Sequence, residues 1–289
     1  MKNKKLQMVR HENSQIKTDF LYWLAGLRDG DGYFSMSKTV STNKNTGKIY
    51  SHSYPRFELT THMVEKINIS GIKAVLGFGA VSNKGKIACR YRVHNKGASK
   101  SLIELLNGKL RLKKRLNQFE LVCNSMGIRI LDANKQKFSE NAWLSGFFEA
   151  DGYFRVNRKS LQFCIKISQV DRELLDAIQL EFGGSIYRSF SKKSQRWCWV
   201  YECSKASNMK MWMNYLNKYS PKGPKKVQYI LFKELIFCKS RKDYKNSKLR
   251  GGFFKKVKFL MENKDYDIII ENSKLQGISH AEYLKITWR

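Results

Sequence analysis

The sequence lacks the cysteine patterns of a zinc site or of a disulfide-bonded secreted domain. Its six cysteines include no Cys-x-x-Cys pair and no Cys/His cluster with zinc-ligand spacing. Cys198 and Cys203 lie five residues apart in a segment whose alternation is typical of a strand. We therefore expect six free thiols, kept reduced in an intracellular compartment.

Acidic residues are also scarce. The 24 Asp and Glu are outnumbered by 55 Lys and Arg, which leaves a formal net charge of +31. This imbalance argues against an ordinary metabolic enzyme and predicts a polyanionic partner. The composition excludes disorder, because 42% hydrophobic and 13% aromatic residues are enough to build a core.

Long apolar runs are missing as well. No uninterrupted apolar stretch approaches the about 20 residues of a membrane-spanning helix, so no membrane partner is expected. The first twenty residues are charged and contain no apolar core of a signal peptide, so we do not expect a secretory signal. Lys outnumbers Arg 39 to 16, which fits an AT-rich coding sequence such as that of an organellar genome.

The chain contains one unit twice. Residues 23–34 read Trp-Leu-Ala-Gly-Leu-Arg-Asp-Gly-Asp-Gly-Tyr-Phe, and residues 143–154 read Trp-Leu-Ser-Gly-Phe-Phe-Glu-Ala-Asp-Gly-Tyr-Phe. Seven of the twelve positions are identical, at an offset of 120 residues. The repeat predicts a first copy at residues 1–125, a linker at 126–136, a second copy at 137–240 and a C-terminal extension at 241–289.

The hydrophobic pattern predicts the same elements in both copies, and therefore an α+β fold. In the first copy we expect helices at 20–30, 63–76, 99–106 and 113–125, and strands at 33–40, 54–61, 77–82 and 86–93. In the second copy we expect helices at 141–150, 171–182, 206–219 and 225–239, and strands at 153–157, 161–168, 185–190 and 196–203.

Small residues share one face of each repeated helix. Gly26 and Gly30 are four residues apart, and Gly146 and Ala150 occupy the same positions in the second copy. Such faces allow two helices to approach until their backbones are nearly in contact. We therefore expect the two motif helices to pack on each other through these residues.

Packing of the small faces would bring two carboxylates together at the helix C-termini. Asp31 and Asp151 end the two helices, and they would repel each other unless cations lie between them. Hard divalent cations such as Mg²⁺ accept carboxylate, carbonyl and water oxygens, and metal pairs serve phosphodiester hydrolysis. The free carbonyls of a helix C-terminus suit a metal further.

Residues 24–32 and 144–152 resemble the two motifs of a single-chain LAGLIDADG homing endonuclease, and the resemblance extends from about residue 15 to 240. It implies two pseudo-symmetric αββαββα repeats, with the motif helices at their interface and two antiparallel sheets forming a DNA-binding saddle. It implies a monomer that uses Mg²⁺, for which Ca²⁺ or Mn²⁺ can substitute in the site. The double-stranded DNA target would be long and asymmetric, spanning about two helical turns or about 20 base pairs, and cleavage would leave short 3′ overhangs. The family's habit and the lysine excess together favour an organelle-encoded, mitochondrial protein.

The resemblance also implies site residues. Asp31 and Asp151 match the metal-binding acids, with the backbone carbonyls of Gly30 and Ala150 as auxiliary ligands. The motifs contain second acids, Asp29 and Glu149, which we expect at the surface or beside the helix cap.

Further positions of the family's site fall near the end of each copy's second strand and before its last helix. Gln169 matches the polar residue that orders the attacking water, and alignment places His62 there in the first copy. Lys225 matches the lysine near the scissile phosphate, and Lys114 is the preferred match among several basic residues in the first copy.

Polar and basic side chains alternate along the predicted strands, which is typical of a half-buried sheet with helices on its other face. A basic strand face is usually only solvated, but the repeat and the net charge favour base or phosphate contacts here. In the first copy the expected DNA contacts are Ser35, Ser37, Lys38, Arg56, Glu58, Arg90 and Arg92. In the second copy they are Arg155, Asn157, Arg158, Gln162, Lys166, Arg188 and Arg196.

Several functions remain open from the sequence. A site-specific, intron-encoded DNA endonuclease is favoured, because both motif acids are intact. An RNA-binding intron maturase on the same fold is the alternative, alone or in addition, with intron RNA as its partner. A DNA-binding regulator without catalysis is a further possibility. A nuclease embedded in an intein is disfavoured, because no splicing-domain Cys or Ser start and no terminal His-Asn is visible.

Overall fold

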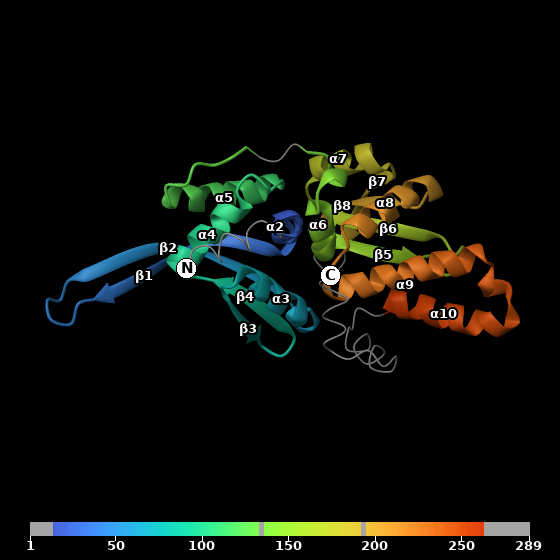
Figure 1. Cartoon of the computed structure of the whole chain (residues 1–289), viewed down its shortest axis with the longest axis horizontal. Helices are drawn as coiled ribbons and strands as arrows, with labels where there is room; N and C mark the ends of the chain where they lie inside the picture. Colours follow the sequence, from blue (N-terminus) through green and yellow to red (C-terminus); the bar gives the residue numbers. More distant parts are fainter. Residues whose placement is uncertain (1–13, 133–135, 192–194, 263–289) are drawn as a thin grey trace, which may run out of the picture. The chain divides into compact units, whose positions relative to one another are not determined.

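The two copies of the repeat fold into separate four-stranded antiparallel sheets (Figure 1). The computed structural model describes residues 14–132, 136–191 and 195–262. The chain divides into two compact units, residues 1–147 and 148–289. The mixture of helices with antiparallel sheets confirms the α+β prediction.

The first unit begins with the motif helix α2 (Ser14–Asp31) and contains a sheet with the strand order β1-β2-β4-β3. Its strands are β1 (Gly32–Thr42), β2 (Ile49–His62), β3 (Ala80–Lys84) and β4 (Ala88–Val93). Its other helices are η1 (Met63–Glu65), α3 (Lys66–Leu76), α4 (Lys96–Leu106), α5 (Lys113–Ser125) and η2 (Phe138–Glu140). The sheet's apolar face packs on these helices through Phe34, Phe57 and Phe119.

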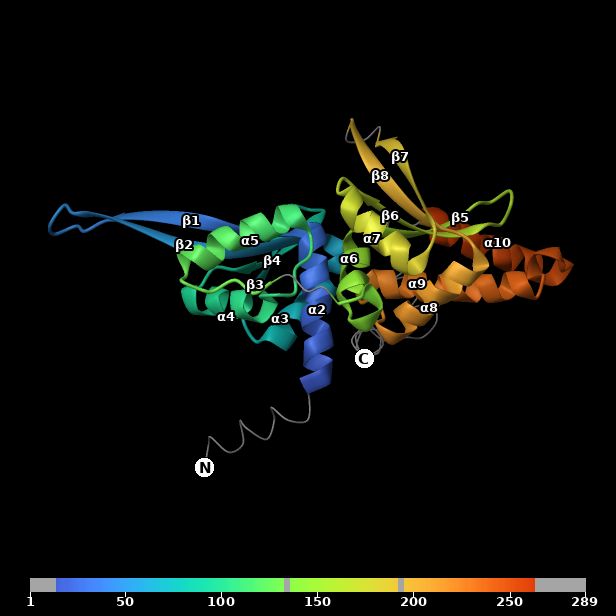
Figure 2. The same ribbon diagram turned by 90° about the horizontal axis from the view of Figure 1, so that it is seen from above.

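The second unit repeats this topology with the strand order β5-β6-β8-β7. Its strands are β5 (Gly152–Val156), β6 (Phe163–Gln169), β7 (Ser185–Ser191) and β8 (Arg196–Cys203). Its helices are the end of α6 (Trp143–Asp151), then α7 (Arg172–Phe182), α8 (Ala206–Lys218), α9 (Gly223–Ser240), η3 (Asp243–Lys245) and α10 (Ser247–Glu262). Figure 2 shows the β7–β8 hairpin projecting away from α8 and α9.

The backbones of α2 and of the first turns of α6 touch within the first unit. A Cβ added at Gly26 would lie 1.9 Å from the carbonyl oxygen of Trp143, and one added at Gly146 would lie 1.8 Å from that of Trp23. Any side chain larger than hydrogen would therefore force the helices apart. The predicted small-residue packing is confirmed at Gly26 and Gly146.

Most predicted elements form, and the main differences lie at their ends. Helix α5 and strand β8 match the prediction residue for residue. Helix α2 begins at Ser14 rather than near residue 20. The strand predicted at 77–82 starts only at Ala80, because Gly77 ends α3 in the left-handed conformation with φ 78°.

The C-terminal extension adds a helix to the second unit. Helix α10 runs beside α9 in both views, and the Sδ atom of Met261 accepts a hydrogen bond from the backbone N–H of Val156 in β5 at 3.1 Å (Figures 1 and 2). The rest of the extension, residues 263–289, lies outside the described residues, as do residues 1–13 and part of the linker, 133–135.

All six cysteines are free, as expected, and five of them are buried. Among the helices in the described part of the chain, none combines the length and apolar character needed to cross a membrane.

Candidate functional site

The end of the second motif helix gathers three of the predicted site residues. Gln169, the last residue of β6, donates from Nε2 to Oδ2 of Asp151 at 3.0 Å. Lys225, in the first turn of α9, is 7% exposed and donates from Nζ to the carbonyl oxygen of Gly152 at 2.8 Å. A carboxylate, an amide and an ammonium group thus surround the junction of α6 and β5.

The equivalent junction in the first copy ends on Asp31, whose side chain is exposed. Gly32 pairs with Leu59 here, whereas Gly152 pairs with Ile167 in the second copy. Counting two residues onward places Thr61, not His62, in the register of Gln169. His62, an exposed residue at the end of β2, is therefore one residue away from the structural counterpart of Gln169.

The basic residue of the first copy is also displaced by one position from its prediction. Lys114 is exposed, whereas the next residue, Arg115, reaches the motif helix. Its guanidinium donates to the carbonyl oxygens of Asp29 at 3.1 Å and Gly30 at 2.9 Å. Arg115 is the third residue of α5 and Lys225 the third residue of α9, so Arg115 is the structural counterpart of Lys225.

The oxygen donors at the two junctions suit a hard divalent cation. Each copy offers a terminal carboxylate, Asp31 or Asp151, and the carbonyl of the preceding residue, Gly30 or Ala150. In the described residues no group of three His, Cys, Asp or Glu side chains forms a metal cluster. A cation held here would therefore complete its shell with water or phosphate oxygens, which is the habit of Mg²⁺.

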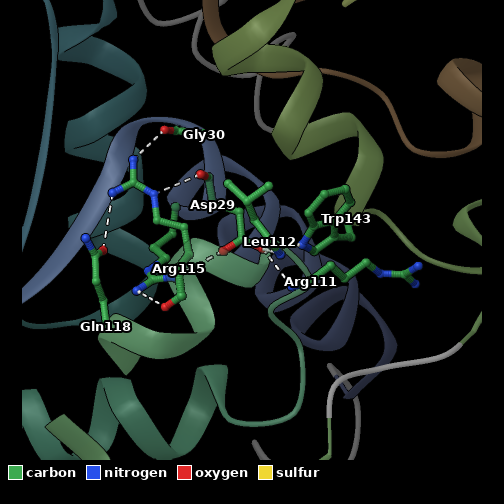
Figure 3. A network of polar contacts seen from close by, with 8 residues as sticks. Asp29, Gly30, Arg111, Leu112, Arg115, Gln118 and Trp143 are labelled. Carbon is green, nitrogen blue, oxygen red and sulfur yellow. Dashed lines mark hydrogen bonds and ion pairs between the residues drawn. The ribbon is translucent and has the colours of Figure 1, made fainter. Parts of the chain in front are cut away.

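The second acid of the first motif, Asp29, is fully buried, which excludes the surface position; it holds the other expected place, close to the end of its helix. Figure 3 shows the network around it. Its Oδ2 accepts from the backbone N–H of Arg111 at 2.8 Å and of Leu112 at 3.3 Å, and from Nε1 of Trp143 at 3.1 Å. Its Oδ1 accepts from the Arg28 guanidinium at 3.1 Å.

The partners of Asp29 match an ionised carboxylate, because each of them donates a hydrogen. Burial raises the pKa of the Asp29 carboxyl, whereas Arg28 and the two backbone N–H groups act in the opposite direction. Burial likewise lowers the pKa of Arg28 to about 10, against the stabilising charge of Asp29. Arg28 also lies over the rings of Phe34 and Phe119, at 5.1 and 5.9 Å from their centroids.

Glu149, the corresponding acid of the second motif, is only 9% exposed, so the surface position is excluded here too and it lies close to the end of its helix. Its Oε1 accepts a hydrogen bond from the backbone N–H of Lys222. Lys222 directly precedes α9, just as Leu112 directly precedes α5. In both copies the acid at this motif position therefore accepts a hydrogen bond from the residue that directly precedes the copy's last helix.

Polar side chains of the first sheet lie on one face, as its register shows. The pairs Tyr33–Glu58, Glu58–Arg92 and Ser35–Arg56 lie side by side, and Ser37 and Arg90 follow by alternation. Lys38 is an exception: it alternates with Ser37 and lies on the opposite side of the exposed β1–β2 hairpin.

Glu58 organises this face, on which the alternation placed it, but only 1% of it is exposed, so the expected direct contact with DNA is not open to it. Its carboxylate pairs with Arg92 at 2.9 Å, Arg90 at 3.4 Å and Arg56 at 3.5 Å. The Tyr33 hydroxyl donates to the same carboxylate. Burial opposes ionisation of Glu58, but Tyr33 and the arginines outweigh it and hold the pKa below its ordinary value.

In the second sheet a lysine, Lys166, occupies the position that Glu58 has in the first sheet. Lys166 pairs with Tyr153 and Glu202 across the strands, as Glu58 pairs with Tyr33 and Arg92 in the first sheet. Lys166 is 5% exposed, so it too is too buried for the direct DNA contact expected of it. It forms an ion pair with Glu202 and donates to the Tyr187 hydroxyl at 2.8 Å.

The remaining predicted contacts of the second copy are exposed. Arg155 and Arg196 share the face of Lys166, whereas Arg188 pairs with Trp199 and therefore lies on the opposite face. Asn157, Arg158 and Gln162 lie in the β5–β6 loop, where the Asn157 side chain accepts from the N–H groups of residues 159 and 160.

Reasoning from the sequence missed Arg115, Thr61 and Glu202 and the burial of the two acids. Two signals were available for Arg115 and the acids. A charged residue stands at the same place in both motifs, and a basic residue stands three positions into each copy's last helix. Only the strand register identifies Thr61.

The comparisons with known proteins agree with this fold and these motifs. The model of the LAGLIDADG endonuclease family matches the chain twice, at residues 24–126 and 144–236. The chain belongs to this family.

Several curated relatives are intron-encoded proteins. The intron-encoded RNA maturase bI4 of Saccharomyces cerevisiae is 33% identical over 182 residues, which are 61% of this chain and 26% of that protein. The intron-encoded DNA endonuclease ai2b of Dictyostelium discoideum is 28% identical over 216 residues, 73% of this chain and 77% of that protein. The probable intron-encoded endonuclease aI2 of Debaryomyces hansenii is 26% identical, and the chain spans only 36% of its length.

Solved structures share the fold. The I-LtrWI LAGLIDADG homing endonuclease bound to target DNA gives a TM-score of 0.67 at 17% identity, covering 85% of this chain and 99% of that one. The LAGLIDADG meganuclease I-AabMI bound to uncleaved DNA gives 0.65 at 20% identity, covering 84% and 99%.

Proposed function

We propose that this chain is a site-specific double-strand DNA endonuclease of the intron-encoded homing type, acting as a monomer. The observation that carries the proposal is the junction at which Gln169 contacts the Asp151 carboxylate and Lys225 holds the adjacent carbonyl. The first motif supplies Asp31 at the same place. Two motifs in one chain provide one such junction for each strand of a duplex.

Asp31 and Asp151, with the carbonyls of Gly30 and Ala150, would hold the divalent cation, which we propose is Mg²⁺. A precedent for a divalent ion is I-SmaMI, a structural neighbour solved with an uncleaved DNA target in the presence of calcium ions. The bound cation supplies Lewis-acid activation of the scissile phosphodiester. Gln169 orients the Asp151 carboxylate and presents an amide to the attacking water.

Lys225 and Arg115 would stabilise the negative charge that develops on the phosphate. Both stand in the first turn of a helix and donate to carbonyls beside a terminal aspartate. Arg115 offers the planar fork of a guanidinium, whereas Lys225 offers a single ammonium group beside the Phe148 ring. Lys114 and His62 would take no direct part.

The DNA would lie on the polar faces of the two sheets. The charge of +31 supplies sequence-independent attraction that weakens with salt. Arg56, Arg90 and Arg92 suit guanine edges in the major groove, because an arginine fork matches O6 and N7 of guanine. The target would be long and asymmetric, about 20 base pairs or two turns, and the cut would leave short 3′ overhangs.

An RNA maturase activity is the second candidate, alone or in addition. It is favoured by the 33% identity to the maturase bI4 over 182 residues. An RNA-binding protein without nuclease activity would not need an acid at the end of each motif helix, and both are present. We propose an organelle-encoded, mitochondrial protein, because its relatives are intron-encoded and its lysine excess fits an AT-rich gene.

Cleavage of a randomised target library, with Mg²⁺ and with EDTA, tests the proposal. Wild-type protein should break both strands at one long site, and only with metal. Asp31→Asn and Asp151→Asn should abolish double-strand breaks while largely preserving binding. Either variant cutting at the wild-type rate would refute the site, and an absence of product together with tight binding of intron RNA would favour the maturase.

A further inference from the structure

Each copy uses one buried acid to hold the start of its last helix. In the first copy Asp29 accepts the backbone N–H of Arg111 at 2.8 Å and of Leu112 at 3.3 Å, directly before α5. In the second copy Glu149 accepts the N–H of Lys222, directly before α9. The same contact is therefore made twice, with a different acid each time.

The helix held in this way carries a basic residue at its third position. Arg115 donates to the carbonyl oxygens of Asp29 and Gly30, at 3.1 and 2.9 Å. Lys225 donates to the carbonyl oxygen of Gly152 at 2.8 Å. In both copies the base therefore contacts a backbone carbonyl directly next to the terminal aspartate of the motif, that of Gly30 before Asp31 or that of Gly152 after Asp151.

Loss of the hydrogen bonds to these buried acids would cost free energy, so the bonds hold the start of each last helix in place. A buried carboxylate needs hydrogen-bond donors, and Asp29 is fully buried while Glu149 is 9% exposed. The first turn of a helix offers N–H groups that have no partner inside the helix, together with the positive end of its dipole. The hydrogen bond from the acid therefore fixes the position of the first turn of the helix. The position of the helix's third residue is fixed with it.

We propose that Asp29 and Glu149 are positioning residues, each of which holds the start of the last helix of its copy and thereby places Arg115 or Lys225 beside the motif's terminal aspartate. This inference rests on the proposed nuclease function. The acids touch neither DNA nor metal in this mechanism. Each acts on one copy, and we infer that each acts on the cleavage of one strand.

The buried acid of the first copy, Asp29, has further hydrogen-bond donors besides the start of the helix. Asp29 also accepts from the Arg28 guanidinium and from Nε1 of Trp143, each at 3.1 Å (Figure 3). Oδ2 alone accepts three N–H groups. An asparagine fits the same volume but must turn its NH₂ toward either the arginine or the three N–H groups, so one face of the network is broken in both orientations.

Strand-resolved cleavage of a doubly end-labelled target separates positioning from folding. Asp29→Asn should slow the cutting of one strand by about 10- to 100-fold, because small misplacements of reacting groups cost this much. Glu149→Gln should slow the other strand, so that the two variants accumulate opposite nicked products. Target affinity, measured in Ca²⁺, should stay near that of the wild type.

Two further variants complete the test. Asp29→Glu keeps a carboxylate, as the second copy does naturally, and should restore most of the wild-type strand ratio. Asp243→Asn is the matched control, because Asp243 is 7% exposed and pairs with Arg241 at 2.7 Å outside both repeats. It should lower stability without any strand preference.

The outcomes distinguish this inference from the function on which it rests. Absence of cleavage by the wild type on every target would refute the nuclease. Cleavage by the wild type, with both strands slowed equally in Asp29→Asn and Glu149→Gln, would overturn the positioning role. Equal slowing that follows thermal stability, as in Asp243→Asn, would assign the acids to folding alone.

Discussion

Replacing Gly26 by alanine tests the backbone contact between α2 and the start of α6. The new Cβ would lie 1.9 Å from the Trp143 carbonyl oxygen and 2.7 Å from the backbone nitrogen of Phe147. An ordinary carbon–oxygen contact is about 3.3 Å, so the helices would have to separate by more than an ångström. No rotamer change relieves a contact made between two backbones.

The magnitude follows from two opposing terms. Overpacking costs about 3 kcal/mol at the upper end of its usual range, whereas alanine returns about 1 kcal/mol of helix propensity. The net loss of about 2 kcal/mol corresponds to a Tm lowered by about 4–8 °C. Circular dichroism during heating measures this shift.

Gly251→Ala in α10 is the matched control. It is another glycine within a helix, and its added Cβ meets nothing within 4 Å. This variant should be stabilised by up to about 1 kcal/mol. If Gly26→Ala melted at or above the wild-type temperature while Gly251→Ala behaved as expected, the inferred backbone contact would be refuted.

Three further predictions concern charged groups. Arg28→Met should destabilise the protein by about 3–5 kcal/mol in urea unfolding, because it leaves Asp29 buried without its cation; Arg172→Met, at an exposed pair, should cost less than about 1 kcal/mol. Glu58→Gln should cost about 2 kcal/mol at pH 7. The folded-state pKa of Glu58 lies below its ordinary value of 4.5. The contribution of ionised Glu58 to the free energy of unfolding is therefore present above pH 4.5 and is lost as pH falls through the folded-state pKa. A stability difference between wild type and variant that persists unchanged in acid would contradict this prediction. Arg92→Ala should cost about 1–3 kcal/mol of DNA-binding free energy and relax base preference at one position of the target. Unchanged affinity and base preference in filter binding would remove Arg92 from the interface.

The repeated motif made most of the fold predictable from the sequence. A motif that recurs at a fixed offset fixes both the number of units and their internal order, so the elements of one copy confirm those of the other. Local pattern was sufficient for α5 and β8, whose bounds match the prediction. The small-residue face at Gly26 also followed from helical spacing alone.

The site was predictable only to within one residue. His62 and Lys114 each lie one position from the structural counterpart of Gln169 or of Lys225, because spacing along a chain does not fix strand register or the first residue of a helix. A shift of one residue turns a side chain to the opposite face of a strand, so this small error exchanges Thr61 for a residue that points elsewhere.

Burial of charged residues could not be predicted, because their partners are distant in the sequence. Asp29 meets the backbone of Arg111 and the side chain of Trp143, which lie 82 and 114 residues away. Glu58 is covered by arginines of a neighbouring strand. Alternation placed Glu58 on the correct face, but only the neighbours across the sheet decide whether it reaches solvent.

Helix α6 restricts how the two halves of this protein can be exchanged with those of relatives. It begins in the first compact unit and ends in the second. A chimera joined in the linker would replace Trp143, whose Nε1 donates to Asp29 at 3.1 Å. The foreign half would keep Asp29 fully supplied with donors only if its own motif helix also began with tryptophan. Exchange of the two halves therefore depends on one indole N–H at the start of the second motif helix.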